Sequence, residues 1–190
     1  MVVKNAKGRP ILLNMVQAIH ENKQYLGDID GLIGDGDHGM NMNKGFVTYG
    51  ERLGEDETTF TDGLNDLGMV LLNEIGGSMG PIYGTIFMDM AEAGEDLDEI
   101  TAADLGTMLE AGLNGLYGIV DAKVGDKTLV DTLAPSVDVM KAAGAEGNKG
   151  SKAAPASADL RPGCASRHRA ARPCRAGSPG NGNRGSCICS

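Results

Sequence analysis

The chain has few of the residues that build large β-sheet cores. Its 190 residues include no Trp, and Phe and Tyr together number only seven. With 41% hydrophobic residues, the core must come mostly from Leu, Ile, Val, Met and Ala, a set that favours packed helices. The sequence also lacks a run of about 18 apolar residues, so it predicts no membrane-spanning helix.

Targeting and zinc-binding patterns are missing as well. The N-terminus lacks the basic stretch followed by an apolar stretch that marks a secretory signal, so the cytoplasm is the expected location. The first 163 residues contain no cysteine, and the four Cys that follow do not have the CxxC spacing of a zinc site.

The charges divide the chain into two unlike parts. Residues 1–140 carry 8 Lys and Arg against 24 Asp and Glu, whereas residues 141–190 carry 9 against 2. An acidic body of this kind is not expected to bind nucleic acid, and it needs metal ions if it is to bind a polyanionic ligand. We expect a helical domain at 1–143 and a low-complexity tail at 144–190.

The tail contains one Leu, one Ile and no Val, Met or aromatic residue. Such a segment cannot bury enough apolar surface to offset the entropy of ordering it. It is either a natural flexible tail or the product of a shifted reading frame in GC-rich DNA. Its Arg residues form only a weak polycation, because no aromatic residues or fold accompany them.

Apolar residues at helical spacing predict six helices and an all-α fold. Pro10 and Pro81 suit first helical turns, Thr61 or Asp62 is a candidate cap, and Thr101–Asp104 resembles a capping box. Pro135 should kink the last helix or mark its true start. No segment shows sustained alternation with period two, so no strand is expected. The predicted helices cover residues 9–26, 41–53, 62–75, 81–93, 101–116 and 128–143.

The strongest motif is the loop from Gly27 to Gly39, which contains DGLIGDGDHG. Asp30, Asp35 and Asp37 would repel one another unless a cation lay between them. Hard oxygen ligands at this density suit Mg²⁺ or Ca²⁺, and the spacing does not fit an EF-hand. A solvated acidic turn is the alternative, but the pair that precedes Gly34, Leu32 and Ile33, is expected to be buried.

Two polar residues follow the aspartates. His38 is a candidate general base, metal ligand or hydrogen-bond donor to phosphate, and its acidic surroundings favour the donor role. Asn41 is expected to begin a helix, either as its N-cap or as an anion contact at its N-terminus.

Two further segments have weaker signals. Gly76-Gly77-Ser78-Met79-Gly80 ahead of a helix can form a backbone-amide cradle for phosphate, although it is not a Walker A loop. In Lys123–Asp131, Lys127 could neutralise phosphate or pair with Asp126, Thr128 is a candidate N-cap, and Leu129 could pack against a base. Taken alone, this second segment would be structural.

Together, GDGDHGMNM, IGGSMGPIYGT and GDKTLVD resemble the L domain of dihydroxyacetone kinases, and most closely the ADP-binding L subunit of the phosphotransferase-dependent enzyme. The resemblance covers roughly residues 9–143. It implies an up-down antiparallel barrel of eight helices, about six of them recognisable here, and an incomplete C-terminal end. The family's closing Gly-Arg-Ala-Ser-Tyr-Leu-Gly-Glu-Arg segment is not found, which favours the shifted reading frame for the tail.

The resemblance also implies the site and its chemistry. Two Mg²⁺ ions would be held by Asp30, Asp35 and Asp37. The ADP or ATP contacts would fall on His38, Gly39, Asn41, Gly77, Ser78, Met79 and Leu129. Met79 departs from the small hydroxylated residue that is usual in the family, and Val120 from a Gly near the nucleotide. No catalytic residue is expected on this chain.

The implied reaction needs two partners. A subunit carrying phosphohistidine would charge bound ADP to ATP, and the γ-phosphate would then pass to dihydroxyacetone on a second, substrate-binding subunit. A homodimer is left open. The alternatives are an L-type domain of an ATP-dependent glycerone or fatty-acid kinase, and a truncated remnant without catalytic function.

Overall fold

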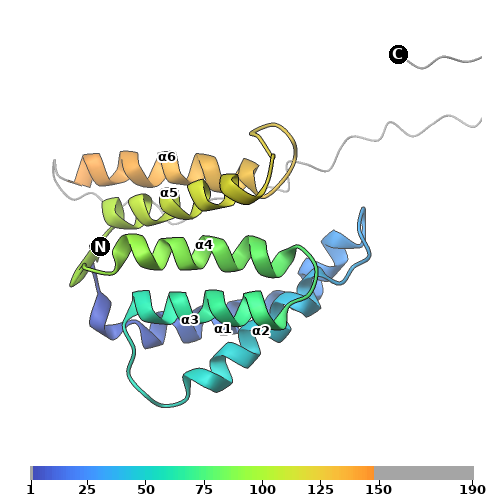
Figure 1. The fold of residues 1–190 in the computed structure, drawn as a ribbon, viewed down its shortest axis with the longest axis horizontal. Coiled ribbons are helices and arrows are strands. Elements are labelled where there is room, and N and C mark those ends of the chain that lie inside the picture. Colours follow the sequence, from blue (N-terminus) through green and yellow to red (C-terminus); the bar gives the residue numbers. More distant parts are fainter. Residues whose placement is uncertain (1, 148–190) are drawn as a thin grey trace, which may run out of the picture. The chain divides into compact units, whose positions relative to one another are not determined.

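The computed structural model describes residues 2–147 and shows a helical domain (Figure 1). The predicted all-α class is confirmed. Within this part of the chain, no helix combines the length and the apolar character that a membrane crossing requires. The tail predicted at 144–190 lies almost entirely outside the described residues, as do all four cysteines. The elements are β1 (Val2–Lys4), a 3-10 turn η1 (Asn5–Lys7), α1 (Arg9–Asp30), α2 (His38–Leu53), α3 (Phe60–Glu74), α4 (Met79–Gly94), β2 (Glu99–Thr101), α5 (Ala102–Ile119) and α6 (Val130–Gly147).

Each helix packs mainly against its neighbours in the sequence. Helices α3 to α6 lie side by side in chain order, and α1 and α2 pack against each other and against α3 (Figure 1). Short turns join α1 to α2 and α3 to α4, and consecutive helices run in opposite directions. This agrees with the predicted up-down arrangement. Closure into a barrel stays a prediction.

One apolar core runs through these helices. Its packing follows the helical spacing of Leu and Met seen in the sequence, with Leu72 as an exception at 44% exposed. Leu72 follows the buried Leu71 in the sequence and lies on the solvent side of α3. The largest fully buried side chains are Tyr49, Leu12, Leu64, Leu67, Leu71, Met108, Leu116 and Val130.

The two short strands were not predicted. Val2–Lys4 pairs antiparallel with Glu99–Thr101, with Val2 opposite Thr101. Directly after β1, the buried side chain of Asn5 donates to the Leu97 carbonyl at 2.7 Å and accepts the Thr61 N–H at 3.1 Å. Three residues are too few for an alternating pattern to be visible in the sequence.

Several predicted boundaries shift by a few residues. Helix α4 begins at Met79 rather than Pro81, and α6 begins at Val130 rather than at 128. Pro135 lies inside α6, so it does not mark the start of that helix.

Candidate functional site

Three turns lie at the same end of the helical domain (Figure 1). They join α1 to α2, α3 to α4, and α5 to α6. Because consecutive helices run in opposite directions, these alternate connections come together at the same end. They contain the three segments that the sequence singled out.

The first turn brings three carboxylates together. Asp30 ends α1, and Asp35 and Asp37 follow in the turn; one oxygen of each lies within 4.8 Å of the others. The N–H of Gly36, which has a φ of 78°, donates to Asp30 Oδ2 at 2.9 Å and folds the turn back on the helix. This conformation explains why a glycine separates the two later aspartates.

The cluster fits a divalent magnesium site in chemistry and in spacing. Oxygens bound to one Mg²⁺ at about 2.1 Å lie roughly 3 to 4 Å apart, so a small closure of the side chains would suffice. Asp30 is partly buried, and Asp35 and Asp37 are open to solvent, which leaves room for a phosphate. The same donors would also accept Ca²⁺.

Two sequence predictions about this turn were wrong. The loop does not begin at Gly27, because α1 continues to Asp30 and holds that carboxylate on a helix. Leu32 and Ile33, which were expected to be buried, are 80% and 99% exposed. They lie in the turn after α1, where no described element covers them.

The first turn of α2 carries the next predicted contacts. The helix begins at His38, so Asn41 is not its N-cap as predicted; instead Asn41 Nδ2 donates to Asp37 Oδ2 at 2.7 Å and orients that carboxylate. Gly39 is buried against α1, where an added Cβ would overlap the carbonyl oxygen of Lys23. Close packing of α1 and α2 therefore sets the position of His38 relative to the carboxylates.

His38 also touches α4. Its Nε2 lies 3.5 Å from the Tyr83 hydroxyl, and the two rings meet edge to face with centroids 5.9 Å apart. Burial raises the pKa of Tyr83, so its hydroxyl stays protonated and able to donate. This contact links the aspartate turn to the start of α4. No local pattern in the sequence predicts this contact, since 45 residues separate the two side chains.

The second turn leads into α4. Gly77 has a φ of 70°, and the hydroxyl of Ser78 makes no capping hydrogen bond. The N–H groups of Met79 and Gly80 lie in the first helical turn, where no carbonyl of the helix can accept them. The Met79 side chain packs against the core, so an anion would meet its backbone N–H.

The third turn precedes α6 and positions Leu129. This side chain is partly buried against the core, and the N–H of Val130 donates to Thr128 Oγ1 at 3.3 Å. Thr128 lies two residues before the start of α6, so the N-cap role predicted for it was wrong by one position. Lys127 has a positive φ of 61°, which is unusual for a residue with a side chain.

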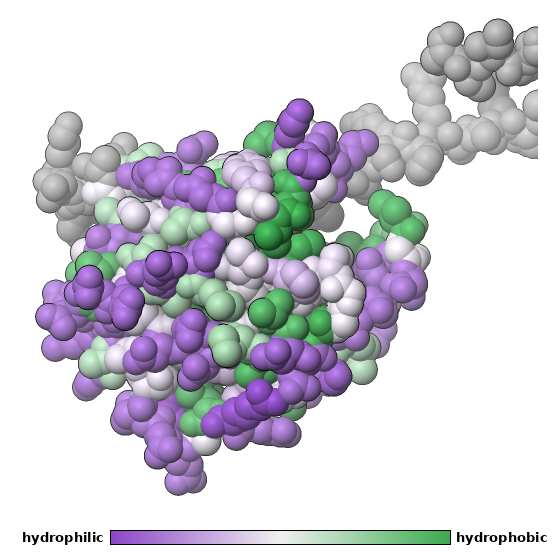
Figure 2. Space-filling model, in the orientation of Figure 1, coloured by the Kyte–Doolittle hydropathy of each residue, from purple (hydrophilic) through white to green (hydrophobic). Residues whose placement is uncertain are grey.

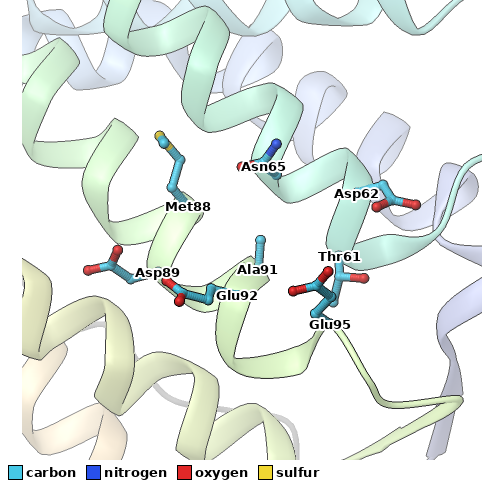
Figure 3. Close-up of a pocket in the computed structure, with 8 residues that line it drawn as sticks. All are labelled: Thr61, Asp62, Asn65, Met88, Asp89, Ala91, Glu92 and Glu95. Atoms are coloured by element: carbon cyan, nitrogen blue, oxygen red, sulfur yellow. The ribbon is translucent and has the colours of Figure 1, made fainter.

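A separate acidic hollow of about 420 Å³ lies between α3 and α4 at the opposite end from Ser78 (Figure 3). Burial, and then the nearby Glu92, raise the pKa of the Asp89 carboxyl there. None of the predicted site residues lines this hollow, and the sequence analysis did not identify it. Its lining residues are Thr61, Asp62, Asn65, Met88, Asp89, Ala91, Glu92 and Glu95.

The described chain is thus a helical domain with an acidic turn and a glycine-serine turn at one end, and the comparison with protein families shows which family it belongs to. Residues 32–166 match the family described as the DAK2 domain, which covers most of the chain, so the protein belongs to this family. The match begins within the aspartate turn and includes all of α2 to α6.

Several bacterial kinase subunits are similar in sequence to this chain. The chain is 38% identical over 125 residues to the ADP-binding subunit DhaL of PEP-dependent dihydroxyacetone kinase 1 from Listeria innocua. It is 36% identical over 121 residues to the Escherichia coli subunit of the same type, and 33% identical over 147 residues to the PTS-dependent one from Lactococcus lactis. These alignments cover 65%, 62% and 76% of this chain and 63%, 57% and 73% of the relatives. The chain thus spans about three fifths of the first two relatives.

Proposed function

We propose that this chain is the nucleotide-binding phosphotransfer subunit of a dihydroxyacetone kinase. The observation that carries the proposal is the convergence of Asp30, Asp35 and Asp37 at the end that also holds the Ser78 turn. Three close carboxylates and a helix N-terminus are complementary to a cation–polyphosphate pair. The relatives from Listeria innocua and Escherichia coli are named as ADP-binding subunits, which supports the same conclusion.

Different residues of the site would contact different parts of the nucleotide. Two Mg²⁺ ions held by the three aspartates would neutralise the phosphates, which is the main requirement of phosphoryl transfer. Leu129 would contact the adenine. The remaining contacts, to the phosphates, would come from His38, Gly39, Asn41, Gly77, Ser78 and Met79.

Bound ADP would act as a coenzyme in a two-step transfer. The first step would break the P–N bond of a phosphohistidine on a partner and form the γ-phosphate of ATP. The second would break the bond between the β-phosphate oxygen and the γ-phosphorus and form a bond to a hydroxyl of dihydroxyacetone, whose proton would pass to the partner that holds this substrate. This chain needs no base for that hydroxyl, because the substrate would be held by the partner.

Exposed apolar residues beside the site support such docking. Leu32 and Ile33 lie in the first turn, Ile119 ends α5, and Val124 lies in the third turn; each is at least 51% exposed. Figure 2 shows apolar surface gathered toward this end of the visible face. Contiguous apolar surface beside a polar site is typical of a protein–protein interface.

The test is Mg²⁺-dependent binding of ADP. The full chain should bind ADP with Mg²⁺ and release it on addition of EDTA, and Asp35→Asn should weaken binding by about 100-fold or more, as expected for loss of a metal ligand. Asp96→Asn is the matched control, since this exposed carboxylate lies after α4 at the other end. Equal affinities of Asp35→Asn and the wild type would refute the proposal.

The same preparation separates the alternatives. Transfer from free ATP to dihydroxyacetone, with no phosphocarrier protein, would indicate the ATP-dependent type of kinase. A chain that binds no nucleotide and unfolds without cooperativity would indicate a non-catalytic remnant.

A further inference from the structure

The turn before α6 is closed mainly by one carboxylate. Asp131, the second residue of α6, accepts the N–H of Gly125 on Oδ1 at 2.5 Å and the N–H of Thr128 on Oδ2 at 3.0 Å. These hydrogen bonds hold the pKa of Asp131 below its ordinary value, so the carboxylate is ionised at neutral pH. Asp126 also stabilises the turn, with one hydrogen bond that it accepts from the N–H of Lys123 at 2.9 Å.

The backbone between these hydrogen bonds has a conformation that the sequence alone would not favour. Gly125 and Lys127 have φ values of 104° and 61°. A left-handed lysine is strained, and it persists only where its surroundings fix it. The two N–H groups that donate to Asp131 lie on either side of Lys127, so the carboxylate holds Lys127 in this conformation.

The turn presents two residues at the end where the carboxylate cluster lies (Figure 1). Leu129 packs partly against the core, and Lys127 is exposed and has no carboxylate partner within residues 2–147. A cation at the end that holds the carboxylate cluster is suited to a phosphate, and an apolar side chain beside it is suited to a base.

We propose that Asp131 is a positioning residue for nucleotide binding, whose carboxylate holds residues 123–129 in the shape that presents Lys127 and Leu129 to an adenine nucleotide. The inference rests on the proposed function. It adds a role for a residue that is not among the predicted nucleotide and metal contacts and that would act through the turn.

The experiment measures Mg-ADP affinity of the full chain by calorimetry. Asp131→Asn keeps the size of the side chain but replaces one acceptor oxygen with an NH₂ group, and it should weaken binding about tenfold, the scale of one charge-assisted hydrogen bond. Asp138→Asn makes the same change at an exposed position of the same helix and should stay within about twofold of the wild type.

A double variant tests whether Asp131 affects ADP affinity through the conformation of the turn. Lys127→Gly removes both the ammonium and the backbone strain, so adding Asp131→Asn to it should cost less than about threefold. Without nucleotide, the Gly125 and Thr128 amides should exchange with solvent faster in Asp131→Asn than in the wild type. An undiminished loss in the Lys127→Gly background would overturn the inference, as would unchanged ADP affinity in Asp131→Asn.

Two other outcomes have separate meanings. Loss of affinity together with a loss of helical circular dichroism would make Asp131 a folding residue and overturn the positioning role. Absence of Mg-ADP binding by the wild type would instead refute the proposed function and, with it, the nucleotide role of Asp131. The amide-exchange comparison would still report whether the carboxylate closes the turn.

Discussion

At the scale of single residues, Gly39 determines how closely α1 and α2 can pack beside the carboxylate cluster. A Cβ at this position would overlap the Lys23 carbonyl oxygen and would also approach the Gly27 N–H. Gly39→Ala should therefore lower the free energy of unfolding by about 2 kcal/mol or more, because backbone of α1 must move to admit the methyl group. Urea denaturation would measure the change.

Gly118→Ala is the matched control for this prediction. Gly118 is an exposed residue of α5 with open space where its Cβ would lie. The substitution should raise the free energy of unfolding by about 0.5 kcal/mol, since alanine loses less backbone entropy in a helix. Equal effects of the two substitutions would show that α1 and α2 do not meet closely at Gly39.

Residue types and spacing predicted part of the site. Clustered aspartates separated by glycines indicate a cation site, and the structure brings Asp30, Asp35 and Asp37 together. Burial of Leu32 and Ile33 could not be judged from hydrophobicity, because that property does not show whether another element covers a turn. The Tyr83–His38 contact was not predictable either, since it depends on how two helices pack.

At the scale of elements, the start of α5 is set by a local motif that the sequence did predict. Thr101 Oγ1 accepts the Asp104 N–H at 3.3 Å, and Asp104 Oδ2 accepts the Thr101 N–H at 2.8 Å. This is the predicted capping box, and it is confirmed. A pattern of four adjacent residues is predictable because it needs no tertiary contact.

The capping box gives a prediction with a defined pH dependence. Thr101→Ala should lower the free energy of unfolding by about 1 kcal/mol at pH 7. Hydrogen bonds from Thr101 hold the pKa of Asp104 below its ordinary 3.8, so this stabilisation is present above pH 3.8 and is lost as the pH falls through the lower folded value. The difference between variant and wild type should therefore shrink in strongly acidic solution.

Thermal or urea unfolding across pH 2 to 7 would measure this, with Thr107→Ala as the control. Thr107 is exposed on the same helix and only donates to the Ala103 carbonyl, so its substitution should have a small effect at every pH. If the loss of unfolding free energy caused by Thr101→Ala grew as the pH fell, the predicted direction of the pH dependence would be wrong.

Other helix starts were harder to predict because several residues could cap them. Helix α3 begins at Phe60, and its cap is Thr59, whose hydroxyl accepts the Asp62 N–H at 2.9 Å. The predicted caps, Thr61 and Asp62, were wrong. Thr61 is buried and hydrogen-bonded to Asn5, a contact across 56 positions that no local pattern encodes.

At the scale of the whole molecule, the excess of acidic residues in 1–140 should make stability depend on cations. Monovalent salt screens the repulsion among these charges and should raise the unfolding temperature. At equal ionic strength, Mg²⁺ at ten times its dissociation constant should add about 3 °C, because the proposed site would bind it only in the folded chain. Differential scanning calorimetry would separate the two effects.

The Asp35→Asn variant serves as the control for the magnesium effect. It should respond to NaCl much as the wild type does, but the additional rise with Mg²⁺ should disappear. A full Mg²⁺ response in this variant would mean that screening by a diffuse ion atmosphere, and not the carboxylate cluster, accounts for the stabilisation.

The pairing of β1 with β2 has a consequence for how the protein is made. Val2 pairs with Thr101, so during synthesis β1 can pair only after about a hundred further residues have been added. The hydrogen bonds of Asn5 form almost as late in synthesis, because the Leu97 carbonyl accepts one of them. The helices between them can fold as they emerge, and the N-terminus is secured only when α5 begins to appear.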